Sequence, residues 1–147
     1  METGYNIALI IHIICAIMFL GYIFTDLFIL SVLPKELGEE KATQLKGKIG
    51  MRAMRFMPFA LLTLILTGGF MISKYINSNA GYFDTSMQQL LVIKAILGLL
   101  IGLLVAFSLT YKIIKGKPNP FLKKYIHKIA IVLGLIIVIL AKLMFVV

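Results

Sequence analysis

Four long stretches of apolar residues, separated by three polar segments, organise the chain. They cover residues 7–33, 54–74, 90–111 and 129–147. An α-helix rises about 1.5 Å per residue, so about 20 apolar residues cross the roughly 30 Å hydrocarbon core of a bilayer. Each stretch is close to that length or longer. The pattern therefore predicts an all-α integral membrane four-helix bundle, built as a single transmembrane domain of residues 1–147.

Prolines and polar residues mark the expected helix ends. Pro34 is expected to end the first helix, because proline lacks an N–H group and disfavours a helical residue before it. The charged stretch 35–50 predicts a short surface helix. Pro58 is expected to be tolerated within the first turns of the second membrane helix. The polar segment 75–86 and the Gly- and Pro-containing segment 116–120 predict the other two connections.

Basic residues concentrate in two of the connections, and this predicts the orientation. The chain is 61% hydrophobic and 14% charged, yet its formal net charge is +9. Twelve of the 15 basic residues lie in these two segments: Lys35, Lys41, Lys46, Lys48, Arg52, Arg55, Lys112, Lys115, Lys117, Lys123, Lys124 and Lys128. Positive loops stay in the cytoplasm, so both termini are predicted to lie outside the inner (plasma) membrane. Cations that flank apolar stretches reflect topology and indicate no nucleic-acid partner.

Three polar residues interrupt the apolar stretches at similar depth. His12 lies about 8 Å below the start of the first stretch, and Lys94 about 6 Å below the start of the third. Lys142 lies about 8 Å before the end of the fourth. A charge near the bilayer centre costs roughly 2.5–3.5 kcal/mol on insertion scales, so the three are expected to share one polar layer in the outer leaflet. The alternatives are lysines that snorkel to the surface and a histidine that only hydrogen-bonds between helices.

Two glycines follow Lys94 on the same helical face. Gly98 and Gly102 are four and eight residues further on, a spacing that keeps them in line with the lysine. Such glycines allow close helix packing, or they leave room beside the lysine for a ligand. Lys74 lies at the outer end of the second stretch, where its side chain can reach the surface.

Soft metal ligands accompany His12 on the first helix. Cys15 and Met18 follow at three-residue steps, and an imidazole with two sulfur ligands could bind Cu(I). Methionine is also a common apolar filler, so packing is the alternative interpretation. Cys15 is the only cysteine, which excludes an intramolecular disulfide.

The cytoplasmic half holds a buried acid and the second histidine. Asp26 lies about 21 Å below His12 along the first helix. It is expected to form an ion pair with Arg52 or Arg55 at the start of the second membrane helix. His127 belongs to the cytoplasmic end as well, so His12 and His127 are too far apart to be axial ligands of one haem.

Short motifs spread over nearly the whole chain suggest a family. They are His12, the Gly21–Phe24 stretch, the Arg52, Arg55 and Pro58 entry to the second helix, the Leu61–Leu64 stretch, and Lys94. With them the chain resembles the small four-helix membrane proteins that include the HemJ-type protoporphyrinogen IX oxidases and the CopD-type copper-resistance domain. In the oxidases, the helix-one histidine and the helix-three lysine are essential, and the proteins bind haem b.

The resemblance implies catalytic roles for His12 and Lys94. His12 would be an axial haem ligand, and Lys94 would be a second ligand or would pair with a haem propionate. Gly98 and Gly102 would make room for the cofactor, and Lys142 and Lys74 would attract its propionates. An enzyme of this kind would be a membrane-bound oxidoreductase acting on a porphyrinogen.

Three functional hypotheses follow. The leading one is a haem b-binding membrane protein similar to protoporphyrinogen oxidase, with or without redox activity. The alternative is a CopD-like copper-binding or copper-transport protein that uses His12, Cys15 and Met18. The third is a structural or assembly subunit without a cofactor. The expected partners are the lipid bilayer and, under the first hypothesis, a porphyrin or a membrane redox partner; a homo-oligomer is compatible with all three.

Overall fold

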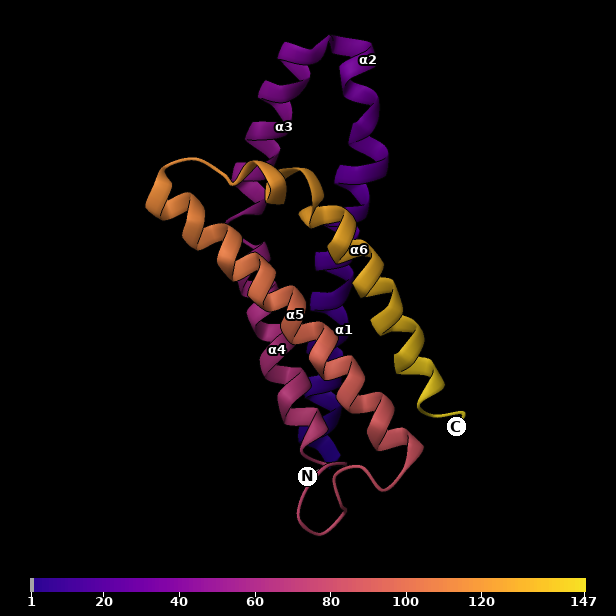
Figure 1. Cartoon of the computed structure of the whole chain (residues 1–147). Helices are drawn as coiled ribbons and strands as arrows, with labels where there is room; N and C mark the ends of the chain where they lie inside the picture. Colours follow the sequence, from indigo (N-terminus) through magenta and orange to yellow (C-terminus); the bar gives the residue numbers. More distant parts are fainter. Residues whose placement is uncertain (1) are drawn as a thin grey trace.

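Helices make up most of residues 2–147, which are the residues that this computed structural model describes (Figure 1). The α-helices are α1 (Glu2–Phe24), α2 (Leu33–Leu37), α3 (Glu39–Ala53), α4 (Met57–Ile72), α5 (Ser86–Lys115) and α6 (Pro120–Leu143). The described part of the chain contains no β-strand, and its isolated β-bridge joins Asn77 to Gly81. The all-α prediction is confirmed.

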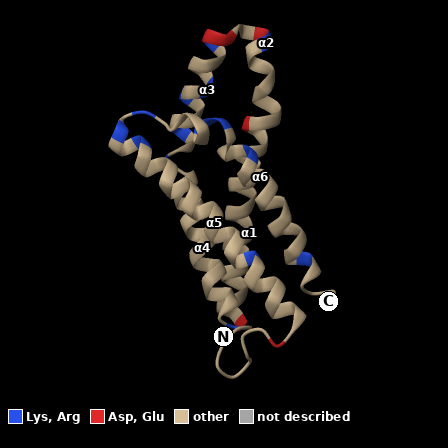
Figure 2. Ribbon diagram, viewed as in Figure 1, with Lys and Arg blue, Asp and Glu red and all other residues tan. Residues whose placement is uncertain are grey.

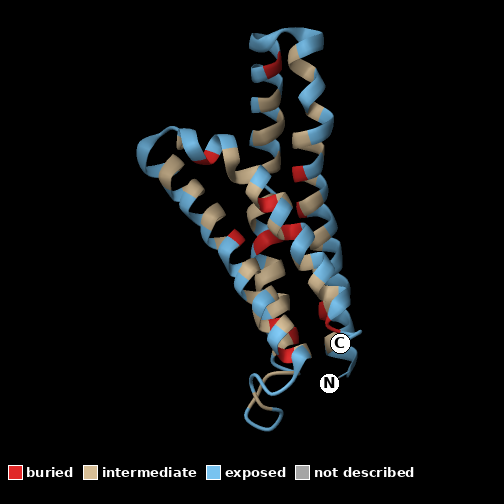
Figure 3. Cartoon of the chain, turned by 45° about the vertical axis from the view of Figure 1, so that its right-hand side comes forward, coloured by how far each residue is buried: buried red, intermediate tan, exposed pale blue. Residues whose placement is uncertain are grey.

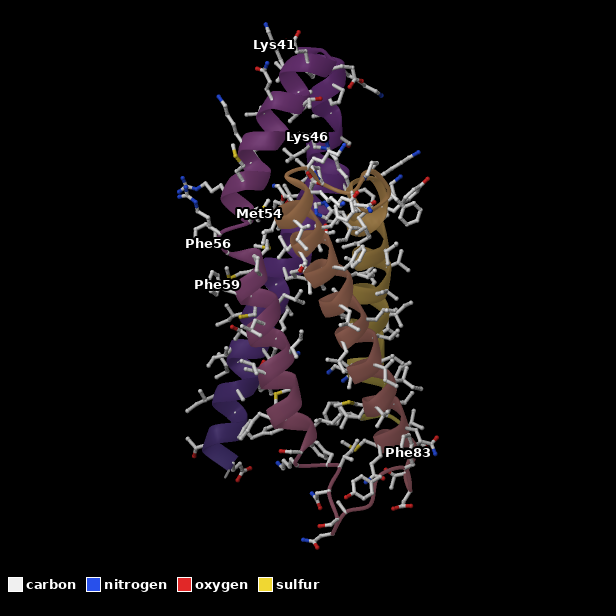
Figure 4. The ribbon with its side chains drawn as sticks, turned by 60° about the vertical axis from the view of Figure 1, so that its left-hand side comes forward. Lys41, Lys46, Met54, Phe56, Phe59 and Phe83 are labelled. Carbon is white, nitrogen blue, oxygen red and sulfur yellow. The ribbon has the colours of Figure 1, made fainter. Side chains whose placement is uncertain are left out.

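Three helical segments are long and apolar enough to cross a membrane. They are Glu2–Leu37, Ser86–Lys115 and Pro120–Leu143. The pair α3 and α4 is bent by 42° and adds a fourth segment if it is counted as one span. Large apolar side chains on the outside of the helices suit contact with lipid: Phe56 and Phe59 project outward near the start of α4 (Figure 4), with 52% and 70% of their surface exposed.

The prediction that the first helix ends at Pro34 is wrong. A π-helical turn (Thr25–Ile29) and a 3₁₀ turn (Leu30–Val32) follow α1 without a break, and Pro34 then lies in the first turn of α2. In a first turn the missing N–H group removes no helical hydrogen bond. The helical path ends instead at Gly38, whose φ of 80° favours glycine.

Polar caps set the starts of α5 and α6. Thr85 caps α5: its side chain accepts a hydrogen bond from the Gln88 N–H group, and the Gln88 side chain accepts one from the Thr85 N–H group. Asn119 caps α6 by accepting from the N–H groups of Phe121 and Leu122. The starts predicted from hydropathy, residues 90 and 129, are therefore too late. Pro58 lies in the first turn of α4, because this helix begins at Met57 and not at the predicted residue 54.

The helices pack as two pairs. Helix α1 packs along α4, and α5 packs along α6. The buried core joins both pairs near their middle and consists of Phe19, Ile23, Leu61, Ile101 and Ala130. Buried positions are few, and the remaining positions of the helices are of intermediate burial or exposed (Figure 3). Away from this small core, the two pairs have room to separate.

The two ends of the molecule differ in charge. Both termini and the connection between α4 and α5 lie at one end, whereas the α2–α3 hairpin projects beyond the other helices at the opposite end (Figure 1). Helix α3 is the helix predicted within residues 35–50, and it begins at Glu39 and ends at Ala53. Lysine and arginine gather toward the hairpin end (Figure 2). This separation is what the predicted topology requires.

Candidate functional site

A cavity of about 350 Å³ lies between the two helix pairs. The walls come from α1, α4, α5 and α6, and the space between α4 and α5 can be followed in Figure 4. Apolar side chains form most of the lining, for example those of Phe19, Leu61, Leu64, Leu91 and Ile137. Small-molecule sites usually measure about 300–1,000 Å³ and combine apolar walls with a few polar groups. This cavity has both properties.

His12 contributes a ring nitrogen whose partner fixes the proton position. Its Nδ1 lies 2.8 Å from Thr67 Oγ1, and Thr67 Oγ1 in turn donates to the Thr63 carbonyl oxygen at 2.6 Å. A hydroxyl group has one proton, so the Thr67 oxygen must accept from Nδ1–H. The other ring nitrogen, Nε2, then carries a free lone pair, as in metal-ligating histidines whose second nitrogen is held by a neighbour.

The Nε2 atom is open to a ligand. Among residues 2–147 it has no hydrogen-bond partner, and every fully buried side-chain nitrogen or oxygen in that range has one. An unpartnered Nε2 is therefore an atom that a small molecule can reach. The half-buried imidazole lies against Gly68, where an added Cβ would be 3.3 Å from His12 Cε1.

Thr67 and Gly68 were not predicted as site residues. The signal was present in the sequence, because Thr63, Thr67 and the Gly68–Gly69 pair are the polar and small positions of an otherwise apolar helix. Threonine at i and i+4 places both residues on one face of α4. Without the partner helix, that face could not be assigned to His12.

Lys94 lines the same cavity from α5. It is half-buried, and neither of the two ion pairs found among residues 2–147 includes it. The structure thus brings His12 and Lys94 together, as their matched depth predicted. Lys142 behaves differently, since it is exposed and does not line the cavity.

The two glycines after Lys94 have different surroundings. Gly98 lines the cavity, and a Cβ added there would meet no atom within 4 Å. A Cβ added at Gly102 would be 2.7 Å from Ile65 Cδ1, and Gly102 is not part of the lining. Gly98 therefore leaves space, whereas Gly102 serves the close approach of α5 to α4.

The sulfur ligands of the copper hypothesis face away from the cavity. Cys15 and Met18 do not line it, and Met18 is 46% exposed. Among residues 2–147 no group of three or more His, Cys, Asp and Glu residues is arranged to hold a metal ion. The set His12, Cys15 and Met18 therefore has only His12 on the cavity.

A second polar cluster lies toward the opposite end of the molecule. Asp26 Oδ2 accepts from His127 Nδ1 at 2.7 Å, and Lys46 Nζ lies 3.8 Å from Asp26 Oδ1. The Tyr22 ring meets the His127 ring edge-on at 5.8 Å between centroids. The cluster connects α1, α3 and α6.

The predicted ion pair of Asp26 with Arg52 or Arg55 is therefore wrong. Both arginines are exposed, next to the bend between α3 and α4. Two features of the fold give Asp26 other partners. Helix α6 begins early enough to include His127, and the helical path beyond α1 runs along α3 as far as Lys46.

Comparisons with known proteins identify no relative that could assign a role to these residues. No protein-family model, curated protein or solved structure matches this chain. The function is therefore inferred from the cavity, its polar atoms and the helices that carry them.

Replacing Asp26 should destabilise the protein. We expect Asp26→Asn to lower the free energy of unfolding by about 1–3 kcal/mol, because a partly buried hydrogen-bonded charge is lost. Thermal unfolding in detergent measures the change. Arg52→Gln and Arg55→Gln are the matched controls and should alter the midpoint little. An equal loss in either arginine variant would contradict the Asp26–His127 pairing.

Proposed function

We propose that the chain is a haem b-binding integral membrane protein: a four-helix bundle with both termini outside. The haem would be held in the cavity between the α1–α4 pair and the α5–α6 pair, with His12 Nε2 as the nitrogen ligand for its iron. The observation that carries this proposal is the hydrogen bond from His12 Nδ1 to Thr67 Oγ1, which leaves Nε2 unprotonated beside an apolar cavity.

The cavity suits a macrocycle in its chemistry. A haem site needs an apolar cleft between helices, a nitrogen ligand for the iron, and cations for the acidic edge of the ring. Apolar side chains supply the cleft, and His12 supplies the nitrogen. Gly68 and Gly98 keep the walls free of side chains next to His12 and Lys94. When bound, haem b would supply one-electron redox chemistry.

Lys94 is assigned to the side of the cavity that faces His12. It lies on α5, whereas His12 lies on α1, and the cavity separates the two helices. A lysine amine can ligate iron only in its neutral form, and a charged one would instead pair with an anionic group of the ligand. Both roles require a reachable nitrogen, and Lys94 makes no ion pair among residues 2–147.

The haem proposal predicts the effect of replacing His12. In protein purified in detergent and supplied with haem b, His12→Ala should abolish the bound haem and its Soret band. His127→Ala is the matched control, because His127 is the other histidine of the chain and is hydrogen-bonded to Asp26 away from the cavity. That variant should retain haem.

Other outcomes separate the alternatives. If His12→Ala retained haem at the wild-type level, the haem proposal would be contradicted. Bound copper without a Soret band, lost on Cys15→Ser or Met18→Leu, would support the copper hypothesis instead. If the wild-type protein binds neither haem nor copper, the hypothesis of a structural subunit is favoured.

Thr67 should act through His12. We expect Thr67→Val to weaken haem binding about 10–100-fold and to shift the Soret band, because the isosteric valine cannot accept from Nδ1–H. Thr63→Val is the matched control, since Thr63 contributes only its backbone carbonyl oxygen to this chain of hydrogen bonds. Titration of both variants with haem gives the dissociation constants. Equal affinities would show that the Thr67 hydrogen bond does not prepare His12 for a ligand.

The proposed orientation has its own test. Because twelve of the 15 basic residues lie in the two predicted cytoplasmic segments, a reporter fused after Val147 should be active only outside the cytoplasm. A periplasm-dependent phosphatase and a cytoplasm-dependent fluorescent protein give opposite readouts. Activity of the cytoplasmic reporter at this position would reverse the topology.

A further inference from the structure

Two tyrosines form one end of the cavity. Tyr5 lies near the start of α1 and Tyr75 just after α4, and both line the cavity. Their rings meet edge-on with centroids 6.1 Å apart, and the two hydroxyl oxygens lie 3.4 Å apart. Together they place two hydroxyl groups at the end of a cavity that is otherwise mostly apolar.

A lysine lies on this tyrosine pair. Lys74 Nζ is 4.4 Å from the centroid of the Tyr5 ring and 5.7 Å from that of Tyr75. An ammonium group has three N–H donors, and those that do not point at the aromatic face stay available. Neither ion pair found among residues 2–147 includes Lys74, so its charge has no carboxylate partner there.

The spacing along α1 sets the length of a ligand that could reach from His12 to the two tyrosines. Tyr5 precedes His12 by seven residues, which is about 10 Å along a helix. A molecule that binds at His12 and fills the cavity toward the tyrosines would need a flat apolar body with an acidic group about that far from its ligating centre.

We propose that Tyr5, Lys74 and Tyr75 form a carboxylate-binding site at the mouth of the cavity, which takes the acidic edge of the ligand bound at His12. This inference rests on the proposed haem function, in which the two propionates are the acidic groups. The lysine supplies the charge. The Tyr75 hydroxyl group donates to the Tyr5 oxygen, which leaves the Tyr5 hydroxyl proton for a carboxylate oxygen.

Lys142 provides the contrast that makes the site specific. It is also an exposed lysine, in the last turn of α6. No cation–π contact to an aromatic ring is found for it within residues 2–147, whereas Lys74 lies over the rings of Tyr5 and Tyr75, which line the cavity. A general attraction of anions to surface lysines would depend on both residues, whereas the proposed site depends on Lys74 alone.

The test compares two probes that differ only in their acidic groups. Purified protein in an uncharged detergent is titrated with haem b and with its dimethyl ester. We expect the wild-type protein to prefer haem by about 10–100-fold, the range for hydrogen bonds to a charged group. Lys74→Met should reduce this preference to near one, and Lys74→Arg should restore most of it. Tyr5→Phe and Tyr75→Phe should reduce it in part, and Lys142→Met should leave it unchanged.

The ratio of the two affinities controls for the greater solubility of the ester in detergent, because that effect is the same in every variant. Circular dichroism and the ester affinity itself show that each variant is folded. Equal affinity of the wild-type protein for both probes would overturn the mouth site and leave the haem function standing. Binding of neither probe would overturn both.

A lipid headgroup is the other source of an anion at this end. Phosphatidylglycerol retained by the purified protein is measured by mass spectrometry in the same variants. If Lys74→Met lowers lipid retention and leaves the ratio of haem to ester unchanged, the lysine serves a lipid phosphate and the proposal is overturned. If the ratio changes and lipid retention does not, the carboxylate site is supported.

Discussion

The hydrogen bond from His12 to Thr67 connects α1 to α4, two helices built mainly from apolar residues. In hydrocarbon, polar groups have to be satisfied within the protein. Two further polar links lie nearer the ends of the bundle. Asp26 joins His127 toward the other end of the bundle, and the amide group of Gln88 donates to the carbonyl oxygens of Tyr75 and Ala80 in the connection before α5. Each link joins segments that hydropathy alone would leave free to slide.

These links matter because apolar packing cannot hold the helix pairs together by itself. Lipid tails are as apolar as leucine, so membrane helices gain little from hiding leucine and isoleucine from their surroundings. The core between the pairs is accordingly small, with Ile101 of α5 and Ala130 of α6 meeting Phe19 and Leu61. Polar links around a small core allow a cavity to persist between the pairs. The small core and the polar links around it therefore leave the cavity that forms the candidate site.

Hydropathy and helix geometry could predict the helices and the neighbourhood of His12 and Lys94, but not the partners of the polar residues. Depth along a helix follows from a constant rise, so two residues on parallel helices can be compared without a structure. Which neighbour a side chain points toward can be predicted only when the positions of the neighbouring helices are known. Asp26 shows this most clearly: it lies in a π-helical turn, which changes the direction of the side chains, and its partner His127 lies on a helix that begins nine residues before the predicted start.

The two histidines show how the same side chain can be given different roles by its partner. His127 donates to a carboxylate that Lys46 also approaches, so its ring belongs to a link between helices. His12 donates to a hydroxyl group that is itself engaged with the backbone of α4, and its remaining nitrogen has no protein partner in residues 2–147. The free nitrogen, the apolar cavity beside it and the lysine facing it are together what a ligand site requires, and this is why we propose the ligand site at His12 rather than at His127.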